Sequence, residues 1–205
     1  AALAALVRNQ GLLLALPFLI WMLQDGFWPQ LRRWRWLLPR LAALAAAPAA
    51  FAGHALYVKL ILGLDWPWVT LAARWKIHTD WPWAGLWGNF LSLTVHASQV
   101  QFSPYSRALD LVFALLALAL LALLFRRLPL AEWAYAAAAM LMFLSKVTDS
   151  MMTTSVARYL LSLHVLFIGL AMLVRGKALR LLLFAVFAFS QIFLLVYFEM
   201  WGFVA

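Results

Sequence analysis

Long apolar runs separated by short polar stretches dominate the chain. About 20 apolar residues are needed to cross the hydrocarbon core of a bilayer as a helix. The runs are rich in Leu and Ala and lack the alternation that is typical of a half-buried strand. The pattern therefore predicts an all-α, polytopic transmembrane protein. Its six expected spans cover residues 1–23, 38–62, 107–125, 130–145, 157–174 and 181–201.

Composition supports a membrane protein. Hydrophobic residues make up 67% of the 205 residues, charged residues 11%, and the mean hydropathy is +0.93. These values lie far outside the range of soluble globular domains. The length suits one membrane domain over residues 1–205. Because the chain begins inside an apolar run, without Met or a basic leader, we expect it to be the C-terminal part of a longer protein.

The distribution of the net charge of +9 predicts an orientation in the membrane. The cations form short clusters between the apolar runs, which argues against a nucleic-acid-binding surface. If the six spans alternate in direction, the three clusters lie on one side of the membrane. Short loops with an excess of Lys and Arg face the cytoplasm, so this side is expected to be cytoplasmic. We expect a multi-pass protein of a bacterial inner membrane, or of the ER membrane in a eukaryote. The clusters are Arg32, Arg33, Arg35 and Arg40; Arg126 and Arg127; and Arg175, Lys177 and Arg180.

The connection over residues 63–106 is then an outer-face loop rich in tryptophan. Indole rings favour the headgroup boundary, so this loop is predicted to lie along the membrane surface. A short interfacial helix is expected at 67–77, and each of the W-P-W triplets at 66–68 and 81–83 predicts the start of a helix. Residues 84–100 are predicted to be re-entrant or interfacial. The tryptophans are Trp66, Trp68, Trp75, Trp81, Trp83 and Trp87, half of the 12 in the chain.

Two positions combine a cation with an apolar surrounding. Arg158 and Tyr159 begin the fifth run, after a loop that contains Lys146 and Asp149. Arg158 is either a snorkelling anchor or a phosphate clamp, since a guanidinium can bond two phosphate oxygens at once. Arg8 lies inside the first run, where an ionisable side chain indicates either a functional site or burial against another helix.

The acidic and histidine side chains give weaker signals. Asp65 and Asp80 are the outer-loop carboxylates best placed to contact a polar substrate, with helix N-capping or solvation as the alternative. His78 and Asp80 form a single H-x-D pair, which is a weak metal signal, and the chain has no cysteine. No metal or other cofactor is expected. Asp110, three residues after Arg107, is expected to pair with it.

Three landmarks resemble the GPI second-mannose transferase (PIG-V) family of polytopic mannosyltransferases and its bacterial relatives. The run "AALAALVRNQGLLLALPFLIWML" is similar to a family helix with an internal TR-x-x-G-LLL. The stretch "GHALYVKLILGLDWPWVTLAARW" resembles a helix that leads into a G-D-P-x-x-F…Q-x-x-W loop, with Trp75 matching the tryptophan. The segment "SVARYLLSLHVLFIGLA" resembles S-x-P-RY-x-L-x-x-FP-L-F-x-L-A, with Arg158 and Tyr159 at the RY pair.

The resemblance implies a glycosyltransferase that moves mannose from a polyprenyl or dolichyl phosphate to a hydroxyl acceptor at the outer or lumenal face. It implies partners limited to this lipid-linked donor, an unidentified acceptor and membrane lipid. The catalytic base is expected outside this chain. The expected donor-phosphate residues are Arg158, Tyr159, Lys146 and Arg8, and the expected substrate-groove residues are Asp65, Trp75, His78, Asp80 and Asp149. A transporter or flippase fragment, or a non-catalytic membrane subunit, is the alternative.

Overall fold

The computed structural model of the chain describes residues 2–7, 9–25, 34–94, 104–148, 153 and 155–199. The described part is mostly helical, which confirms the predicted helical class. The helices are α1 (Ala2–Val7), the 3-10 helix η1 (Asn9–Leu14), α2 (Ala15–Gln24), α4 (Trp34–Leu56) with its π-helical continuation η2 (Tyr57–Ile61), α5 (Pro67–Trp75), α6 (Pro82–Thr94), α7 (Pro104–Leu124), α8 (Leu130–Leu144), α9 (Val156–Leu160), α10 (His164–Leu173) and α11 (Lys177–Glu199).

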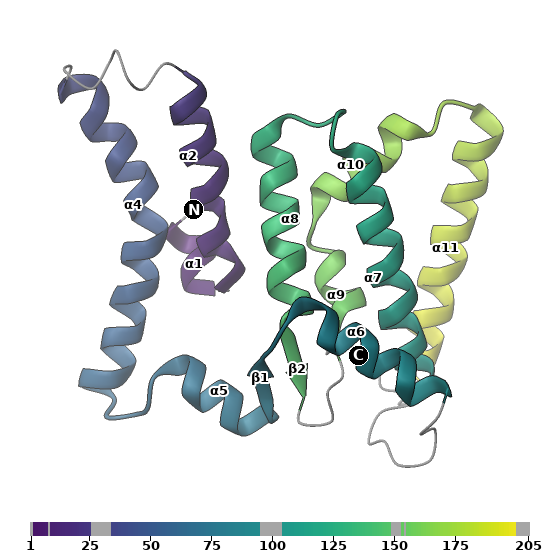
Figure 1. Cartoon of the computed structure of the whole chain (residues 1–205), viewed down its shortest axis with the longest axis horizontal. Helices are drawn as coiled ribbons and strands as arrows, with labels where there is room; N and C mark the ends of the chain where they lie inside the picture. Colours follow the sequence, from purple (N-terminus) through teal and green to yellow (C-terminus); the bar gives the residue numbers. More distant parts are fainter. Residues whose placement is uncertain are drawn as a thin grey trace.

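The long helices stand side by side, and short elements run across one end of the bundle (Figure 1). We call this the sheet end, because it carries strands β1 (Ile77–Thr79) and β2 (Lys146–Thr148) together with α5 and α6. The opposite end holds the start of α4, the turn between α7 and α8, and the start of α11. We call it the basic end, and its described cations are Arg35, Arg40, Arg126, Arg127, Arg175, Lys177 and Arg180.

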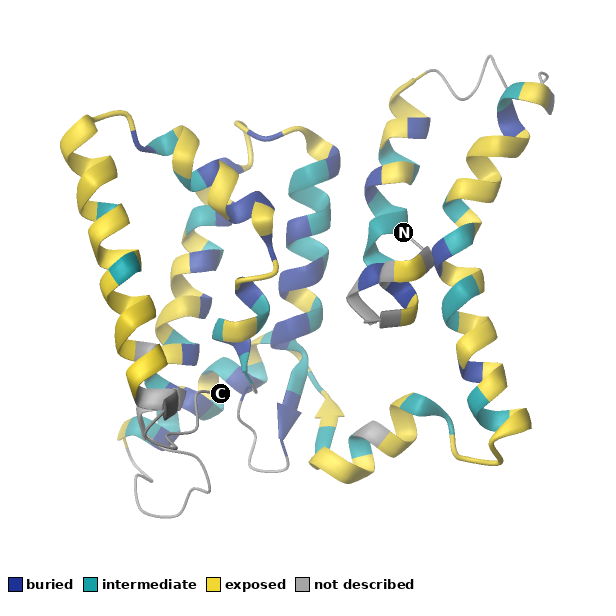
Figure 2. Cartoon of the chain, turned by 180° about the vertical axis from the view of Figure 1, so that it is seen from behind, coloured by how far each residue is buried: buried dark blue, intermediate teal, exposed yellow. Residues whose placement is uncertain are grey.

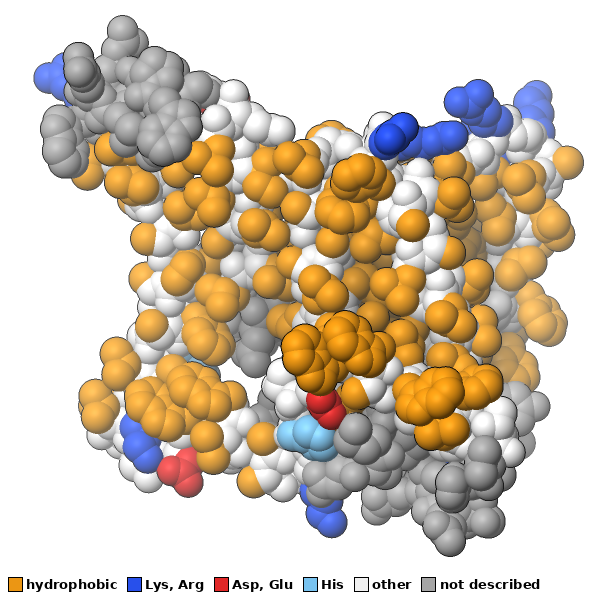
Figure 3. Space-filling view, viewed as in Figure 1, with side chains coloured by type: hydrophobic (Ala, Val, Ile, Leu, Met, Phe, Trp, Pro, Cys, Tyr) orange, Lys and Arg blue, Asp and Glu red, His pale blue; other side chains and the backbone are white. Residues whose placement is uncertain are grey.

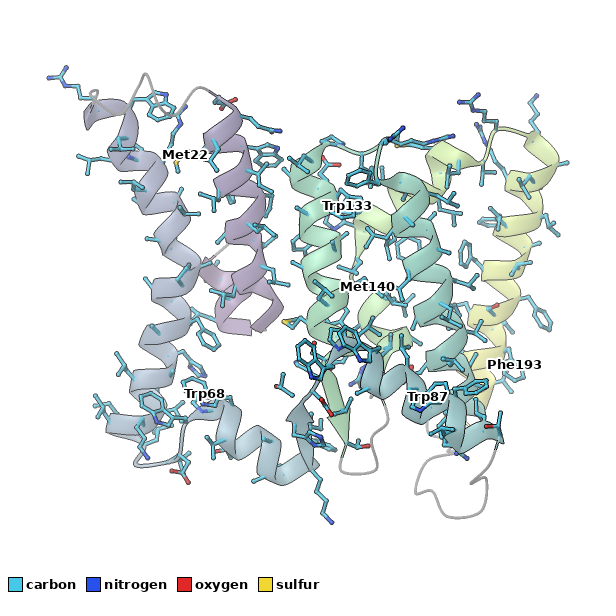
Figure 4. All side chains as sticks on the ribbon, in the orientation of Figure 1. Met22, Trp68, Trp87, Trp133, Met140 and Phe193 are labelled. Carbon is cyan, nitrogen blue, oxygen red and sulfur yellow. The ribbon has the colours of Figure 1, made fainter. Side chains whose placement is uncertain are left out.

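The predicted clusters of cations gather at the basic end, and the sheet end carries Lys59, Arg74, Lys76, Lys146 and Arg158. Figure 3 shows Lys and Arg side chains along the edge that carries the turns at the basic end, and hydrophobic side chains over the middle of the bundle. Figure 4 places Trp68 and Trp87 at the sheet end and Trp133 toward the basic end. The described members of the three basic clusters thus share one end. Arg32 and Arg33 lie outside the described residues.

The spans agree only in part with the expected six. Among the described residues, Arg35–Ile61 and Arg107–Leu124 are long and apolar enough to cross a membrane. The shorter apolar helices are Gly11–Gln24, Leu130–Leu144 and His164–Leu173. The described residues therefore contain long apolar helices, and two of these are long enough to cross a membrane.

Two of the expected spans are interrupted. Where a single helix was predicted at 1–23, α1 packs against η1 and α4, and α2 begins only at Ala15. The span predicted at 157–174 divides into α9 and α10, with the backbone of Leu163 outside the helical region. The Ser162 hydroxyl donates to the carbonyl of Tyr159 at 2.6 Å. The backbone N–H of Ser162 donates to the same carbonyl at 3.0 Å, so a tight turn closes the end of α9.

The structure also contains a two-stranded sheet that was not predicted from the sequence. β1 and β2 are antiparallel, and their register pairs Ile77 with Thr148, His78 with Val147 and Thr79 with Lys146. The backbone N–H of Asp80 extends the pairing by donating to the carbonyl of Ser145 at 2.9 Å. The tryptophan-rich segment that contains β1 is therefore fixed to the end of α8.

Both helix starts that the W-P-W triplets predict are present, although α5 ends at Trp75, two residues before the predicted end. Pro67 is the first residue of α5 and Pro82 is the first residue of α6, so both W-P-W triplets open a helix. The core of the bundle lies between α7, α8, α9 and α10, where Figure 2 shows buried positions on facing helix sides. Gly169 of α10 lies so close to Leu124 of α7 that a Cβ there would collide with it.

Candidate functional site

Three of the four expected phosphate-binding residues lie together at the sheet end. The Lys146 ammonium lies 5.8 Å, and the central carbon of the Arg158 guanidinium 5.6 Å, from the centroid of the Tyr159 ring. Both distances are within the range of about 6 Å in which a cation is attracted to an aromatic ring. We call Lys146, Arg158 and Tyr159 the Tyr159 cation site. Arg8, the fourth expected residue, lies outside the described residues.

Local structure explains why the two cations meet at this ring. Lys146 is the first residue of β2, directly beyond the end of α8, and Arg158 and Tyr159 lie on the short helix α9. The Tyr159 ring stacks on Phe143 of α8 with centroids 5.0 Å apart and an angle of 19° between the planes. Phe143 is buried, whereas Arg158 is exposed. The ring is thus held by the core while the guanidinium stays accessible.

A layer of buried polar side chains lies at the same end. Asn89 of α6 donates to the hydroxyl of Thr153 at 2.5 Å, and Arg107 of α7 donates to the carbonyl of Ser92 at 3.0 Å. The carboxylate of Asp110 accepts the backbone N–H of Ala157 at 2.9 Å. We call this set the polar layer; the buried polar or charged side chains among the described residues are Asn89, Ser92, Arg107, Asp110, Thr148 and Thr153.

The polar layer corrects one expectation. Arg107 and Asp110 were predicted to pair with each other, but each binds the backbone of another element instead. Two buried polar atoms of the layer, Asn89 Oδ1 and Arg107 Nε, have no hydrogen-bond partner in the described part of the chain. Buried polar groups without a partner are costly in an apolar surrounding.

Helix α6 buries its polar side chains on one face and exposes large apolar side chains on the other. Its buried positions are Gly85, Asn89 and Ser92, at spacings of four and three residues that define one helix face. Its large apolar side chains point outward, with exposed fractions of 63% for Trp83 and 60% for Trp87. The spacing of Gly85, Asn89 and Ser92 is the sequence signal from which this face could be predicted.

The expected substrate-groove residues are brought together only in part. The register of β1 and β2 places His78 and Asp80 next to the segment that starts with Lys146, and the Asp80 carboxylate accepts the N–H of Trp81 at 2.7 Å. Asp65 instead lies just before α5, at the end distant from β1, and forms an ion pair of 3.0 Å with Lys59 of η2. Its side chain does not cap α5, whose N-cap is Trp66.

Two of the remaining groove predictions have different outcomes. Trp75 ends α5 with 60% of its surface exposed, so an aromatic surface is available there. Asp149 lies outside the described residues. Among the described residues no group of three potential metal-binding side chains occurs.

A shallow apolar groove of about 390 Å³ lies between α6 and α7. Its walls carry almost no polar surface, so it offers contact to hydrocarbon rather than to a sugar or phosphate. The lining residues are Trp83, Leu86, Trp87, Phe90, Leu111 and Leu115.

No family model, curated protein or solved structure matches the chain.

Proposed function

We propose that this protein is a multi-pass integral membrane glycosyltransferase that uses a lipid-phosphate-linked sugar, with mannose as the first candidate. In this proposal six apolar segments lie in the membrane, the basic end faces the cytoplasm, and the sheet end faces the periplasm or the ER lumen. The protein resides in a bacterial inner membrane, or in the ER membrane of a eukaryote. The resemblance to the PIG-V family supports the proposal.

The exposed surface supports a bilayer as the solvent of the bundle. Leu60, Phe184 and Phe189 have 72%, 73% and 71% of their surface exposed. Figure 2 shows exposed positions along most of α11 and much of α4. Soluble proteins rarely expose apolar patches larger than a few hundred Å². Lipid tails would cover these helices at no cost, and the outward tryptophans of α6 would then lie at the headgroup boundary.

The observation that carries the proposed activity is the Tyr159 cation site. A lipid phosphate places its charge at the headgroup boundary, where the aromatic sheet end of the bundle would lie. Lys146 and Arg158 flank one ring there, and Arg158 is exposed. An ammonium and a guanidinium together can neutralise the charge that develops on a departing phosphate monoester.

The proposed reaction needs one bond made and one broken. An oxygen of the acceptor hydroxyl attacks the anomeric carbon of the sugar with inversion, and the bond from that carbon to the phosphate oxygen breaks. The lipid phosphate leaves with the electron pair and is stabilised by Arg158 and Lys146. A carboxylate takes the acceptor proton. We place this base outside the chain, while Trp75, His78 and Asp80 line the approach for the sugar and acceptor.

A second candidate function, transport or flipping of a lipid, is supported by the interrupted helices. The segment η1–α2 and the segment α9–α10 both pack against α8. Interrupted helices near a substrate site are characteristic of transporters. Against this alternative, the apolar runs contain no repeat symmetry that would relate two halves.

The distinguishing experiment is a transfer assay in native membranes that contain the protein or its variants, where the carboxylate base is also present. Radiolabelled polyprenyl phosphate mannose is supplied, and label in an endogenous acceptor is measured. The proposal predicts strong transfer that falls at least tenfold in Arg158→Ala and less in Arg158→Lys, since lysine keeps the charge without the two-pronged geometry. Arg126→Ala, at the basic end, is the matched control. Movement of the lipid phosphate across proteoliposomes without transfer of sugar would favour the transporter instead.

A further inference from the structure

The helix that carries Arg158 is too short to hold its own direction. α9 has five residues, and its N-cap, Ser155, has a positive φ of 53° and makes no side-chain capping bond. An isolated helix of this length is unstable in water. Val156 and Leu160 are buried and hold one side of α9 in the core. Its orientation must therefore depend on this packing and on a polar contact from another element.

The carboxylate of Asp110 supplies that contact from α7. It accepts the backbone N–H of Ala157, the residue before Arg158, at 2.9 Å. The backbone N–H groups of Ser155 and Val156 and the Arg158 guanidinium are near enough to interact with its charge. Asp110 is only 4% exposed. A buried carboxylate that accepts a backbone N–H makes a strong and directional contact, because the charge strengthens the hydrogen bond.

We propose that Asp110 is a positioning residue, which holds α9 in the orientation that presents Arg158 to a lipid phosphate. The ligand part of this inference rests on the proposed function, whereas the orientation of α9 can be measured without any ligand. Asp110 touches neither the sugar nor the phosphate in this account, and it acts through the backbone of α9.

The orientation is tested by electron paramagnetic resonance in nanodiscs. The chain has no cysteine, so Leu161→Cys, whose native side chain is 69% exposed directly after α9, gives a single site for a nitroxide label. We expect one ordered spectral component with native Asp110, a second and more mobile component in Asp110→Asn, and a predominantly mobile label in Asp110→Ala. Glu132→Gln, on α8 near the basic end, should leave the spectrum unchanged. If Asp110→Ala does not fold, Asp110→Asn decides, and unchanged mobility in a folded Asp110 variant overturns the proposal.

The consequence for the ligand is tested by the affinity for dodecyl phosphate. Removal of a negative charge near Arg158 would by itself tighten the binding of an anion. Loss of the anchor predicts the opposite, about tenfold weaker binding in Asp110→Asn. The double variant Asp110→Asn/Arg158→Ala should bind no more weakly than Arg158→Ala, because the two residues act through one contact.

The outcomes separate the two proposals. Tighter binding in Asp110→Asn, or losses that simply add in the double variant, would overturn the positioning role while leaving the phosphate site intact. Equal binding by the native protein and Arg158→Ala would instead remove the phosphate site from the proposed function. The nitroxide spectra would still decide whether Asp110 orients α9.

Discussion

Thr79 and Lys146 are register partners in the antiparallel sheet, although they belong to segments that are far apart in the sequence. Side chains of directly opposed residues in such a sheet lie on the same face. The pairing joins the tryptophan-rich outer segment to the residue that supplies one cation of the Tyr159 cation site. A change in the outer segment should therefore be felt at that site through the sheet.

Gly85 is predicted to be the most sensitive small residue of α6. A Cβ at this position would meet Thr153 Cγ2 at 2.6 Å and Val147 Cγ1 at 2.8 Å. Gly85→Ala should lower the free energy of unfolding by about 1–3 kcal/mol, because β2 and the Thr153 segment must shift. Thermal unfolding in detergent measures this. Gly53→Ala in α4 is the control, since nothing lies within 4 Å of its Cβ, and equal stability of the two variants would contradict the packing described at Gly85.

Asn89 and Thr153 are predicted to be energetically coupled. Their side chains are bonded at 2.5 Å in a buried position. Asn89→Ala and Thr153→Ala should each destabilise the protein, and the double variant should lose less than the sum by about 1 kcal/mol. A double-mutant cycle on the unfolding free energy gives this coupling. Strict additivity would mean that the bond contributes nothing to stability.

The ring of Tyr159, rather than its hydroxyl, is predicted to organise the cation site. The ring stacks on Phe143 and lies beside both cations. Tyr159→Phe keeps these contacts and should bind dodecyl phosphate within about threefold of the native protein, whereas Tyr159→Leu should lose tenfold or more. Fluorescence titration measures both affinities. A large loss in Tyr159→Phe would show that the hydroxyl contacts the ligand.

The two ends of the bundle are predicted to lie on opposite sides of the membrane. Because the chain has no cysteine, Thr79→Cys reports on the sheet end and Arg126→Cys on the basic end. In intact cells a membrane-impermeant maleimide should label Thr79→Cys, and Arg126→Cys should react only after lysis. Labelling of both in intact cells would contradict the proposed orientation.

The positions of most helices could be predicted from the sequence, because their lengths follow from the apolar runs. The start of α5 and that of α6 follow from Pro67 and Pro82, whose fixed φ and missing N–H suit a first helical turn. The sheet could not be predicted, since each strand has three residues and pairing depends on contacts distant in sequence. The break between α9 and α10 could not be predicted either, because residues 161–163 contain no Gly or Pro.

The residues of the Tyr159 cation site could be predicted from the sequence, whereas the hydrogen bonds of Asp110 and Arg107 beneath it could not. Arg158, Tyr159 and Lys146 stand out because cations are unusual beside apolar runs. Asp110 and Arg107 were assigned to each other because they lie three residues apart, and this local reading was wrong. In the folded chain Arg107 bonds to α6 and Asp110 bonds to α9, and the spacing of residues in the sequence does not show which distant backbone groups will be near them.

The most direct test of the central claim is the affinity of the protein in nanodiscs for polyprenyl monophosphate without a sugar. The account predicts saturable binding that weakens by about 2 kcal/mol, roughly thirtyfold, in Arg158→Ala. Arg158→Lys should lie between this variant and the native protein, and Arg126→Ala should bind as the native protein does. Equal binding by the native protein, Arg158→Ala and Arg126→Ala would contradict the assignment of the Tyr159 cation site to a lipid phosphate.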